Sequence, residues 1–320
     1  MSNSLSASVS PGYRLGPLEF ATGMSGLNAW TYLYVCLAIM PVISFLSFSQ
    51  PYVLTEIIGI PPERHGQVTG LLITMHEIVV LALVSFAGGL SDRVGRRPLY
   101  ATGTLVAGAG FAIYGMASTV GDLYAGRFVY AIGLAFVGVM IAVTAADYPA
   151  ESSRGKIAGV SGVLNGLGIG LATALFAALP TIFKAQGMSS ANAGRYMLFV
   201  MAGLAALTAI IMQVGLKGGT PSGGSARISL PRILQIGIRQ GLDNPRLLVC
   251  YAGSFISRAD LTLVATFVSL WLQRVGRDEG LDGPAALAKA GLMFALIQGS
   301  ALLWAPVAGA LIDRFHRLAC

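Results

Sequence analysis

The sequence predicts an all-α polytopic membrane protein, and three features of its composition and pattern carry that prediction. Hydrophobic residues make up 55% of the 320 residues and charged residues only 11%, whereas soluble domains carry about a quarter charged residues. The 41 glycines are typical of membrane helices, which approach one another closely at small residues. Apolar runs of about 20 residues, long enough to cross a bilayer as a helix, recur without the alternation of a strand.

Eight such runs predict eight membrane spans. The first follows a polar segment and is too long for the apolar core of a signal peptide, so we expect it to remain as a span. In chain order, the predicted spans are Ala29–Phe48, Val68–Leu90, Leu99–Ala117, Leu123–Ala145, Ile157–Phe183, Met197–Leu216, Leu247–Leu272 and Ala286–Ile312.

The spans divide the chain into four regions. We expect a cytoplasmic N-terminal segment over 1–27, a six-helix N-terminal bundle over 28–216, a cytoplasmic linker over 217–246, and the first two helices of a second bundle over 247–320.

The linker is predicted to begin with a flexible segment, Lys217–Ala226, and to continue as an amphipathic helix. Arg232, Arg239 and Arg246 recur every seven residues, so on one helix they would share a face. Such a helix is expected to lie on the inner membrane surface.

The distribution of basic residues predicts the orientation. Most of the 21 Lys and Arg residues fall in loops on the same side as the N-terminus, which predicts a cytoplasmic N-terminus in a bacterial-type inner (plasma) membrane. These residues are scattered instead of forming one patch, so nucleic acid is not an expected partner. The expected partners are the lipid bilayer and a small-molecule substrate.

The stretch "FAGGLSDRVGRRPLY" after the second span concentrates charge between glycines. Gly88 and Gly95 are predicted to permit a sharp turn and close helix approach. Asp92 at the end of a helix opposes the negative end of the helix dipole and therefore needs cationic partners. The candidates for this cluster are Arg93, Arg96, Arg97 and Arg154, with Asp147 completing it. The alternative is that these arginines only mark a cytoplasmic loop.

The second span has a copy later in the chain. Gly70–Arg96 aligns with Gly291–Arg317 without gaps at a shift of 221 residues, and both share the pattern G-x-L-x-D-R-x-x-R. The copied motif contains Gly309, Asp313 and Arg314. The eighth span is therefore predicted to repeat the second, which implies a repeat six spans long.

These motifs resemble those of the major facilitator superfamily. Gly88 to Arg97 is similar to the family's signature between spans two and three, and Gly309 to Arg317 to its degenerate copy. Arg127-Phe-Val-Tyr-Ala-Ile-Gly133 and Asp147 to Lys156 resemble further family motifs. The resemblance implies the family fold, alternating access, and a role for the charged cluster as a cytoplasmic latch.

Family members have twelve or more spans in two six-span halves. We therefore expect this chain to be truncated after the eighth span, and the full-length protein to be a monomer.

Polar residues within the spans are the candidates for proton coupling or a substrate cavity, because charge at membrane depth is costly and usually functional. Glu77 lies near the middle of its span beside His76, and Gln298 is its repeat equivalent. Glu77 is predicted to carry a proton; the alternative is a protonated, structural carboxyl group.

Two further spans carry buried charge. Arg258 and Asp260 lie near the middle of the seventh span, and an arginine in the cavity would favour an anionic substrate group. The family resemblance implies proton coupling for Arg127; the alternative is a structural ion pair with Asp122 or a loop.

The fifth span contains Gly162-Val-Leu-Asn165-Gly-Leu167-Gly-Ile-Gly170. This resembles the glycine-rich signature of drug–proton antiporters, but Leu167 stands where that signature has Pro. Ordinary close packing is the alternative, and Asn165 is a candidate cavity residue.

Enzyme motifs are not found in the sequence. There is no phosphate-binding glycine loop with Lys-Ser/Thr and no zinc-binding His-Glu-x-x-His helix, and the three cysteines lack metal-site spacing. We therefore expect no catalytic residues, metal or cofactor, and a proton gradient as the energy source.

The predicted function is secondary active transport of a small organic solute, with efflux favoured over uptake. The alternative is a transporter-like solute receptor or scaffold.

Overall fold

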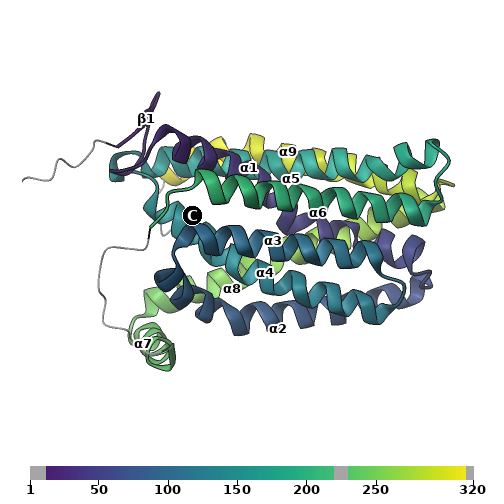
Figure 1. Cartoon of the computed structure of the whole chain (residues 1–320), viewed down its shortest axis with the longest axis horizontal. Helices are drawn as coiled ribbons and strands as arrows, with labels where there is room; N and C mark the ends of the chain where they lie inside the picture. Colours follow the sequence, from purple (N-terminus) through teal and green to yellow (C-terminus); the bar gives the residue numbers. More distant parts are fainter. Residues whose placement is uncertain (1–11, 220–229, 315–320) are drawn as a thin grey trace, which may run out of the picture.

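The computed structural model describes residues 12–219 and 230–314, and only some of the side chains in its last three helices. The chain folds into long helices that run side by side (Figure 1). The elements, in order, are β1 Arg14–Leu15, β2 Leu18–Glu19, α1 Gly26–Tyr52, the π-helix η1 Val53–Ile57, α2 Pro62–Val94, α3 Arg96–Met116, α4 Val120–Asp147, the 3₁₀-helix η2 Glu151–Ser153, α5 Arg154–Ala185, α6 Ser190–Gly215, α7 Leu230–Asp243, α8 Pro245–Asp278 and α9 Gly283–Arg314.

The all-α membrane architecture is confirmed. Each of the eight predicted spans coincides with one helix, α1 to α6, α8 or α9. Within the described residues, six helices (α1 to α6) are long and apolar enough to cross a membrane. A helix pairs its own backbone N–H and C=O groups, and it needs to do so in a membrane because lipid tails offer them no hydrogen-bonding partners.

Small residues set the spacing between α3 and α4. A Cβ atom added to Gly110 would lie 2.5 Å from Tyr130 Cβ, and one on Gly133 would lie 2.4 Å from the backbone nitrogen of Ala107. Side chains cannot approach so closely, so only glycine permits this contact. The tight pairing fixes the position of the α4 side chains described below.

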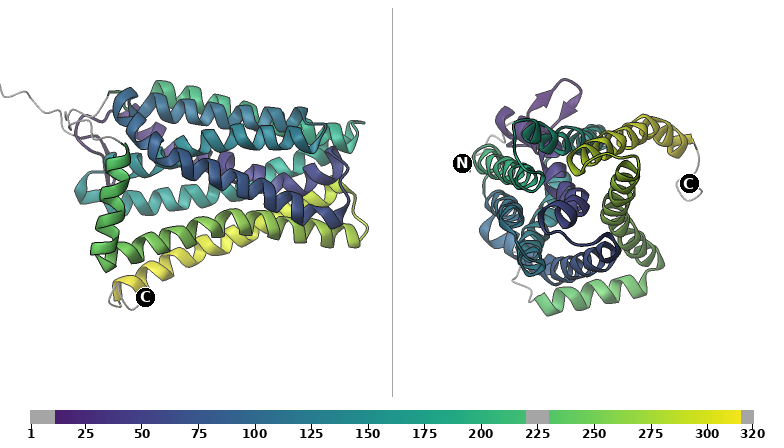
Figure 2. Two further views of the ribbon diagram at one scale, coloured as in Figure 1. Left: turned by 90° about the horizontal axis from the view of Figure 1, so that it is seen from below. Right: turned by 90° about the vertical axis from the view of Figure 1, so that its right-hand side faces the viewer.

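The hairpin of α8 and α9 packs on the six-helix bundle through α1 and α5 (Figure 2). Ser269 on α8 donates a hydrogen bond to the carbonyl oxygen of Phe48 on α1 at 2.6 Å. On α9, a Cβ atom on Gly291 would lie 2.1 Å from the carbonyl oxygen of Thr173 on α5. The first helices of the second half are therefore in direct backbone-level contact with the first half.

The N-terminal segment forms a small hairpin that the sequence analysis did not identify. β1 and β2 pair antiparallel, and Phe20 behind them is buried. The hairpin is hydrogen-bonded to the loop between α4 and α5, through Ala21 N to Tyr148 O at 2.8 Å and Ala150 N to Glu19 O at 2.9 Å.

The start of the linker is tied to the same place. The backbone nitrogen of Lys217 donates to the Tyr148 hydroxyl at 3.1 Å, and its Nζ donates to the carbonyl oxygen of Thr22 at 3.1 Å. We call this set of contacts among the hairpin, the α4–α5 loop and Lys217 the N-terminal clasp.

The linker contains the predicted helix, α7, which lies across the ends of the long helices (Figure 2). The prediction that three arginines share one face of this helix is only partly right. Arg246 lies on the next helix, α8, which begins at Pro245. The helix is interrupted at Asn244, between α7 and α8, so Arg246 does not share a helical face with Arg232 and Arg239 on α7. Most of the segment predicted to be flexible, Lys217–Ala226, lies outside the described residues.

Candidate solute and proton site

Arg127 on α4 is the most deeply buried charged residue of the described core. It is 1% exposed. Its Nη2 donates to Ser47 Oγ on α1 at 3.0 Å, and its guanidinium lies 5.5 Å from the Tyr130 ring centroid. Its Nε and Nη1 are buried without an acceptor among the described residues. Because burying a charge is costly unless its donors are satisfied, these nitrogens are placed to receive an acceptor.

Gln50 on α1 adds a third buried nitrogen atom that lacks an acceptor, after the two of Arg127. It is 2% exposed, and its Oε1 accepts a hydrogen bond from the Tyr114 hydroxyl at 3.2 Å. The same hydroxyl lies beside Arg127, so Tyr114 joins the two groups. The amide nitrogen of Gln50 has no acceptor in the described part of the chain. We call Gln50, Tyr114, Arg127 and Tyr130 the donor cluster.

His76 and Glu77 on α2 lie next to the donor cluster. His76 is 4% exposed, and its ring centroid is 5.6 Å from that of Tyr130. The Glu77 side chain is 38% exposed, and its Oε1 lies 4.0 Å from His76 Nε2. Glu77 stands midway along α2, in agreement with its predicted place near the middle of the span. His76 and Glu77 are thus close enough for their side chains to interact.

Asn165 and Gln298 are half-buried on α5 and α9, which pack together. A Cβ atom on Gly166 would lie 2.6 Å from Leu302 Cδ2, and one on Gly168 would lie 2.1 Å from the carbonyl oxygen of Leu37. Close packing, the alternative weighed for this glycine-rich span, therefore describes these two glycines.

The charged stretch after α2 turns the chain as predicted at Gly95. That residue has φ +97°, which L side chains rarely adopt, and it separates α2 from α3. Arg96 then begins α3 and forms an ion pair with Asp147 at the end of α4. The Nε atoms of Arg96 and Arg97 are buried without an acceptor within the described residues.

Asp92 and Gly88 differ from the prediction. Asp92 and Arg93 are exposed, and no ion pair joins Asp92 to an arginine within residues 12–219. Arg154 pairs with Glu151 at 3.0 Å instead. The close approach expected at Gly88 is wrong, because a Cβ atom there would meet nothing within 4 Å. The helix break at Gly95 sends Arg96 toward α4, so Asp147 is the carboxylate that is paired. The latch role of this region stays a prediction.

The partner weighed for Arg127 has another role. Asp122 accepts hydrogen bonds from the backbone nitrogens of Ser118 at 2.9 Å and Thr119 at 2.8 Å, and so caps the start of α4. The remaining predicted residues lie outside the described side chains; they are Arg258, Asp260, Gly309, Asp313 and Arg314.

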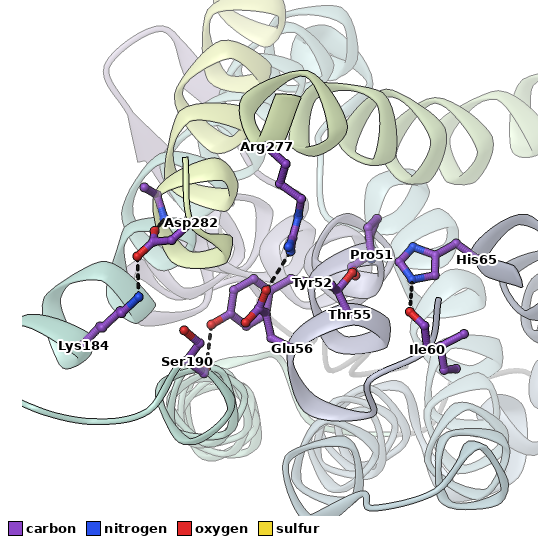
Figure 3. Close-up of polar contacts among 11 residues, drawn as sticks. Pro51, Tyr52, Thr55, Glu56, Ile60, His65, Lys184, Ser190, Arg277 and Asp282 are labelled. Carbon is purple, nitrogen blue, oxygen red and sulfur yellow. Dashed lines mark hydrogen bonds and ion pairs between the residues drawn. The ribbon is translucent and has the colours of Figure 1, made fainter. Parts of the chain in front are cut away.

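The sequence analysis missed two ion pairs between the halves (Figure 3), which lie at the end of the helices opposite the β1–β2 hairpin. Glu56 on η1 pairs with Arg277 on α8, with Oε1 and Nη2 2.9 Å apart, and Lys184 on α5 pairs with Asp282.

A signal for the first of these pairs was present in the sequence. Glu56 and Arg277 are 221 residues apart, which equals the shift of the internal repeat. Phe48 and Ser269, which are hydrogen-bonded, have the same separation. Repeat-equivalent positions therefore meet where α1 and η1 pack against α8, and applying the shift to the residues just beyond the first predicted span would have matched a carboxylate with an arginine.

Comparisons with known proteins agree with this architecture. The magnetosome protein MamZ of Magnetospirillum gryphiswaldense is 26% identical over 94% of this chain and 46% of its own length. The magnetosome protein MamH of Paramagnetospirillum magneticum is 23% identical over 89% of this chain and 64% of its own length. A class E tetracycline resistance protein of Escherichia coli is 32% identical, over 41% of this chain and 30% of its own length.

Among solved structures, a bacterial homologue of the human lysosomal transporter Spinster, inward-facing and unoccupied, superposes with a TM-score of 0.56. The superposition covers 92% of this chain and 64% of that one at 16% identity, and so supports the fold alone. The chain spans about half the length of MamZ and less than two thirds of the other relatives named here. The family description Major Facilitator Superfamily matches residues 20–319. On this match and this fold, the chain belongs to the major facilitator superfamily of membrane transporters.

Proposed function

We propose that the protein is a secondary active transporter that moves a small organic solute by alternating access and is driven by the proton gradient. The donor cluster carries this proposal. Gln50 and Arg127 present three buried nitrogen atoms that lack an acceptor in the described structure, and they lie on two helices of the N-terminal bundle. Intramembrane polar groups of this kind are functional by default.

The chemistry of the cluster favours a solute with oxygen acceptors. Arginine binds carboxylate and other oxygen anions through several N–H groups at once, and the Gln50 amide adds a neutral donor. Two relatives are named tetracycline resistance proteins, and tetracycline is rich in such oxygens. Resistance is consistent with efflux, the direction favoured from the sequence.

Glu77 is the proposed proton carrier. It is a half-buried carboxyl group at mid-membrane depth, beside the buried imidazole of His76. A carboxyl group in such a place binds and releases protons as its surroundings change. The Tyr130 ring contacts both Arg127 and His76, the residue that precedes Glu77.

The location follows from the basic-residue bias. We propose a bacterial-type inner membrane with the N-terminus in the cytoplasm. Because two relatives are named magnetosome proteins, a magnetosome membrane is the second location to examine in a cell that forms these organelles.

Transport is testable with the complete gene product in proteoliposomes. We expect tetracycline to accumulate in vesicles with an acidic lumen and accumulation to collapse when an ionophore removes the pH gradient. Glu77→Gln is expected to abolish gradient-driven accumulation and to leave tetracycline exchange intact. Glu63→Gln is the matched control, because Glu63 is an exposed carboxylate on the same helix, and it should transport normally.

Two results would contradict the proposal. Tetracycline binding without movement across the vesicle membrane would favour the receptor alternative. Normal concentrative transport by Glu77→Gln would remove Glu77 from the mechanism.

A further inference from the structure

The N-terminal clasp holds the backbone directly after α4 at the end of the bundle where the β1–β2 hairpin lies (Figure 1). The helix ends at Asp147. Just beyond it, Ala21 N donates to the carbonyl oxygen of Tyr148 at 2.8 Å, and Ala150 N donates to the carbonyl oxygen of Glu19 at 2.9 Å. The clasp therefore fixes the chain immediately beside the carboxylate that pairs with the start of α3.

Tyr148 connects the clasp with the arginines that begin α3. Its side chain is buried, its ring centroid lies 5.4 Å from that of Tyr32, and its hydroxyl accepts the hydrogen bond from Lys217 N. Burial raises the pKa of Tyr148, and the hydrogen bond from Lys217 opposes this rise. The charges of Arg96 and Arg97 also favour a lower pKa, because both guanidinium groups lie near the phenol. The hairpin, the linker, α1 and α3 thus meet at this residue.

The hairpin sequence suits this docking. Gly16 has φ +55° and stands first in a two-residue turn, as a tight hairpin requires. Leu18 and Phe20 are buried in the core of the bundle, whereas Glu19 between them accepts a hydrogen bond from Ser152 Oγ at 2.7 Å. Both sides of the second strand are therefore engaged, and a slip of one residue would expose the apolar side.

The Arg96–Asp147 ion pair gains from a fixed backbone. Both side chains are partly exposed, and exposed pairs contribute little because two side chains must be held in one geometry. A carboxylate whose backbone is already ordered loses less conformational freedom when it pairs. Without the clasp, Asp147 would stand on a frayed last turn, as residues at helix ends commonly do.

We propose that the N-terminal clasp positions Asp147 for Arg96, so that docking of the hairpin and formation of this ion pair favour one another. Coupling between two sites is reciprocal. An event that lifts the hairpin weakens the pair, and loss of the pair loosens the hairpin by the same factor. The N-terminal segment can in this way act on the turn between α2 and α3. The inference concerns the protein without solute and does not depend on the proposed transport.

The test follows docking of the hairpin through a buried reporter. Ser153 is 2% exposed, and its Oγ accepts a hydrogen bond from Glu19 N at 3.1 Å. A thiol at this position is expected to react with maleimide only when the hairpin lifts from the α4–α5 loop. The reporter Ser153→Cys is placed in the full chain with its three native cysteines replaced by alanine, in lipid nanodiscs and at one pH.

A proline variant loosens the hairpin without changing any charge. Ala150 has φ −67° and ψ 149°, which proline can adopt, so Ala150→Pro removes the N–H that donates to Glu19 and keeps the backbone path. We expect labelling about fivefold faster than in the parent, as for the loss of one hydrogen bond. Ala150→Ser keeps the N–H and should label at the parental rate.

Reciprocity predicts the effect of the ion pair on the same reporter. Asp147→Asn and Arg96→Gln should each label about two- to fivefold faster than the parent, the range set by a partly exposed pair. The double variant should label no faster than either single variant, because both remove one interaction. Asp147→Glu keeps the charge and should label close to the parental rate. Asp92→Asn is the matched control, since Asp92 is an exposed carboxylate at the same end, and it should not accelerate labelling.

A charge swap, Arg96→Asp with Asp147→Arg, should restore slow labelling. Parental labelling of both Asp147→Asn and Arg96→Gln would overturn the proposal, as would additive acceleration in the double variant. Equal acceleration by Asp92→Asn would contradict it too, because net charge would then explain the effect. Parental labelling of Ala150→Pro would show that this backbone bond does not hold the hairpin. Should Ala150→Pro fail to fold, the surface variants at Asp147 and Arg96 still decide.

Discussion

At the scale of single residues, Arg127 shows a charge kept in the core at the expense of stability. Its hydrogen bond to Ser47 and its contact with Tyr130 each contribute about 1 kcal/mol, whereas burying an ion costs several kcal/mol. A residue retained on these terms is expected to serve binding or coupling.

We predict that Arg127→Met leaves the melting temperature unchanged or raises it, and lowers transport at least tenfold. The long apolar side chain fills the same space and removes the buried charge. The melting temperature in detergent and initial rates in proteoliposomes are the measurements. Arg195→Met is the matched control, because Arg195 donates to the carbonyl oxygen of Gly115 outside the donor cluster. A large loss of stability in Arg127→Met would indicate a structural role for the charge.

A second prediction concerns the carboxylate of the latch region. The side chains of Arg96 and Asp147 are 27% and 36% exposed, so their pair is expected to contribute about 1 kcal/mol. Since that energy changes the ratio of two conformations about fivefold, Asp147→Asn should alter turnover more than Asp92→Asn does.

A double-mutant cycle with Arg96→Gln measures this coupling directly. Additive effects of the two substitutions would show that the pair does not contribute to the conformational balance. A larger effect from Asp92→Asn would favour the partner chosen from the sequence.

What the sequence predicts about residues depends on how far apart the partners are. Spacing indicated that charges cluster after α2, but it could not choose between Asp92 and Asp147 because the choice depends on the direction of the turn at Gly95. The partners Lys184 and Asp282 are 98 residues apart, and no local pattern connects them.

At the scale of elements, glycines in one helix differ sharply in what they face. On α5, a Cβ atom on Gly168 would clash with the carbonyl oxygen of Leu37, whereas one on Gly162 would meet nothing within 4 Å. The sequence alone predicts the same role for these two glycines, since both belong to one glycine-rich stretch.

We therefore predict opposite outcomes for two identical substitutions. Gly168→Ala should destabilise the protein by separating α1 from α5, by about 1–3 kcal/mol as for an overpacked core. Gly162→Ala should be neutral or stabilising by up to about 1 kcal/mol, because alanine is the better helix former. Thermal aggregation in detergent reports both. Equal effects would mean that the α1–α5 contact does not depend on Gly168.

The elements themselves were predictable where they are long. Apolar runs located all eight long helices because each must match the thickness of a bilayer. The β1–β2 hairpin and η1 were not predicted, because strands of two residues and a shift in helical hydrogen bonding leave no periodic pattern in the sequence.

At the scale of the whole molecule, orientation is the property to measure first. In whole cells, we predict that an impermeant maleimide labels Gln186→Cys in the α5–α6 turn but reaches Lys156→Cys at the start of α5 only after permeabilisation. Both positions are exposed, so labelling reports the side of the membrane. Labelling of Lys156→Cys in intact cells would reverse the orientation drawn from the basic residues.

The N-terminal clasp has a mechanical consequence for a molecule built to move. The chain leaves the six-helix bundle at Lys217, which is fastened to Tyr148 and Thr22, so a pull along the linker is resisted by these bonds before it reaches the last turn of α6. We therefore expect the clasp to hold the end of α6 in place when force acts along the linker, so that the six-helix bundle moves as one body.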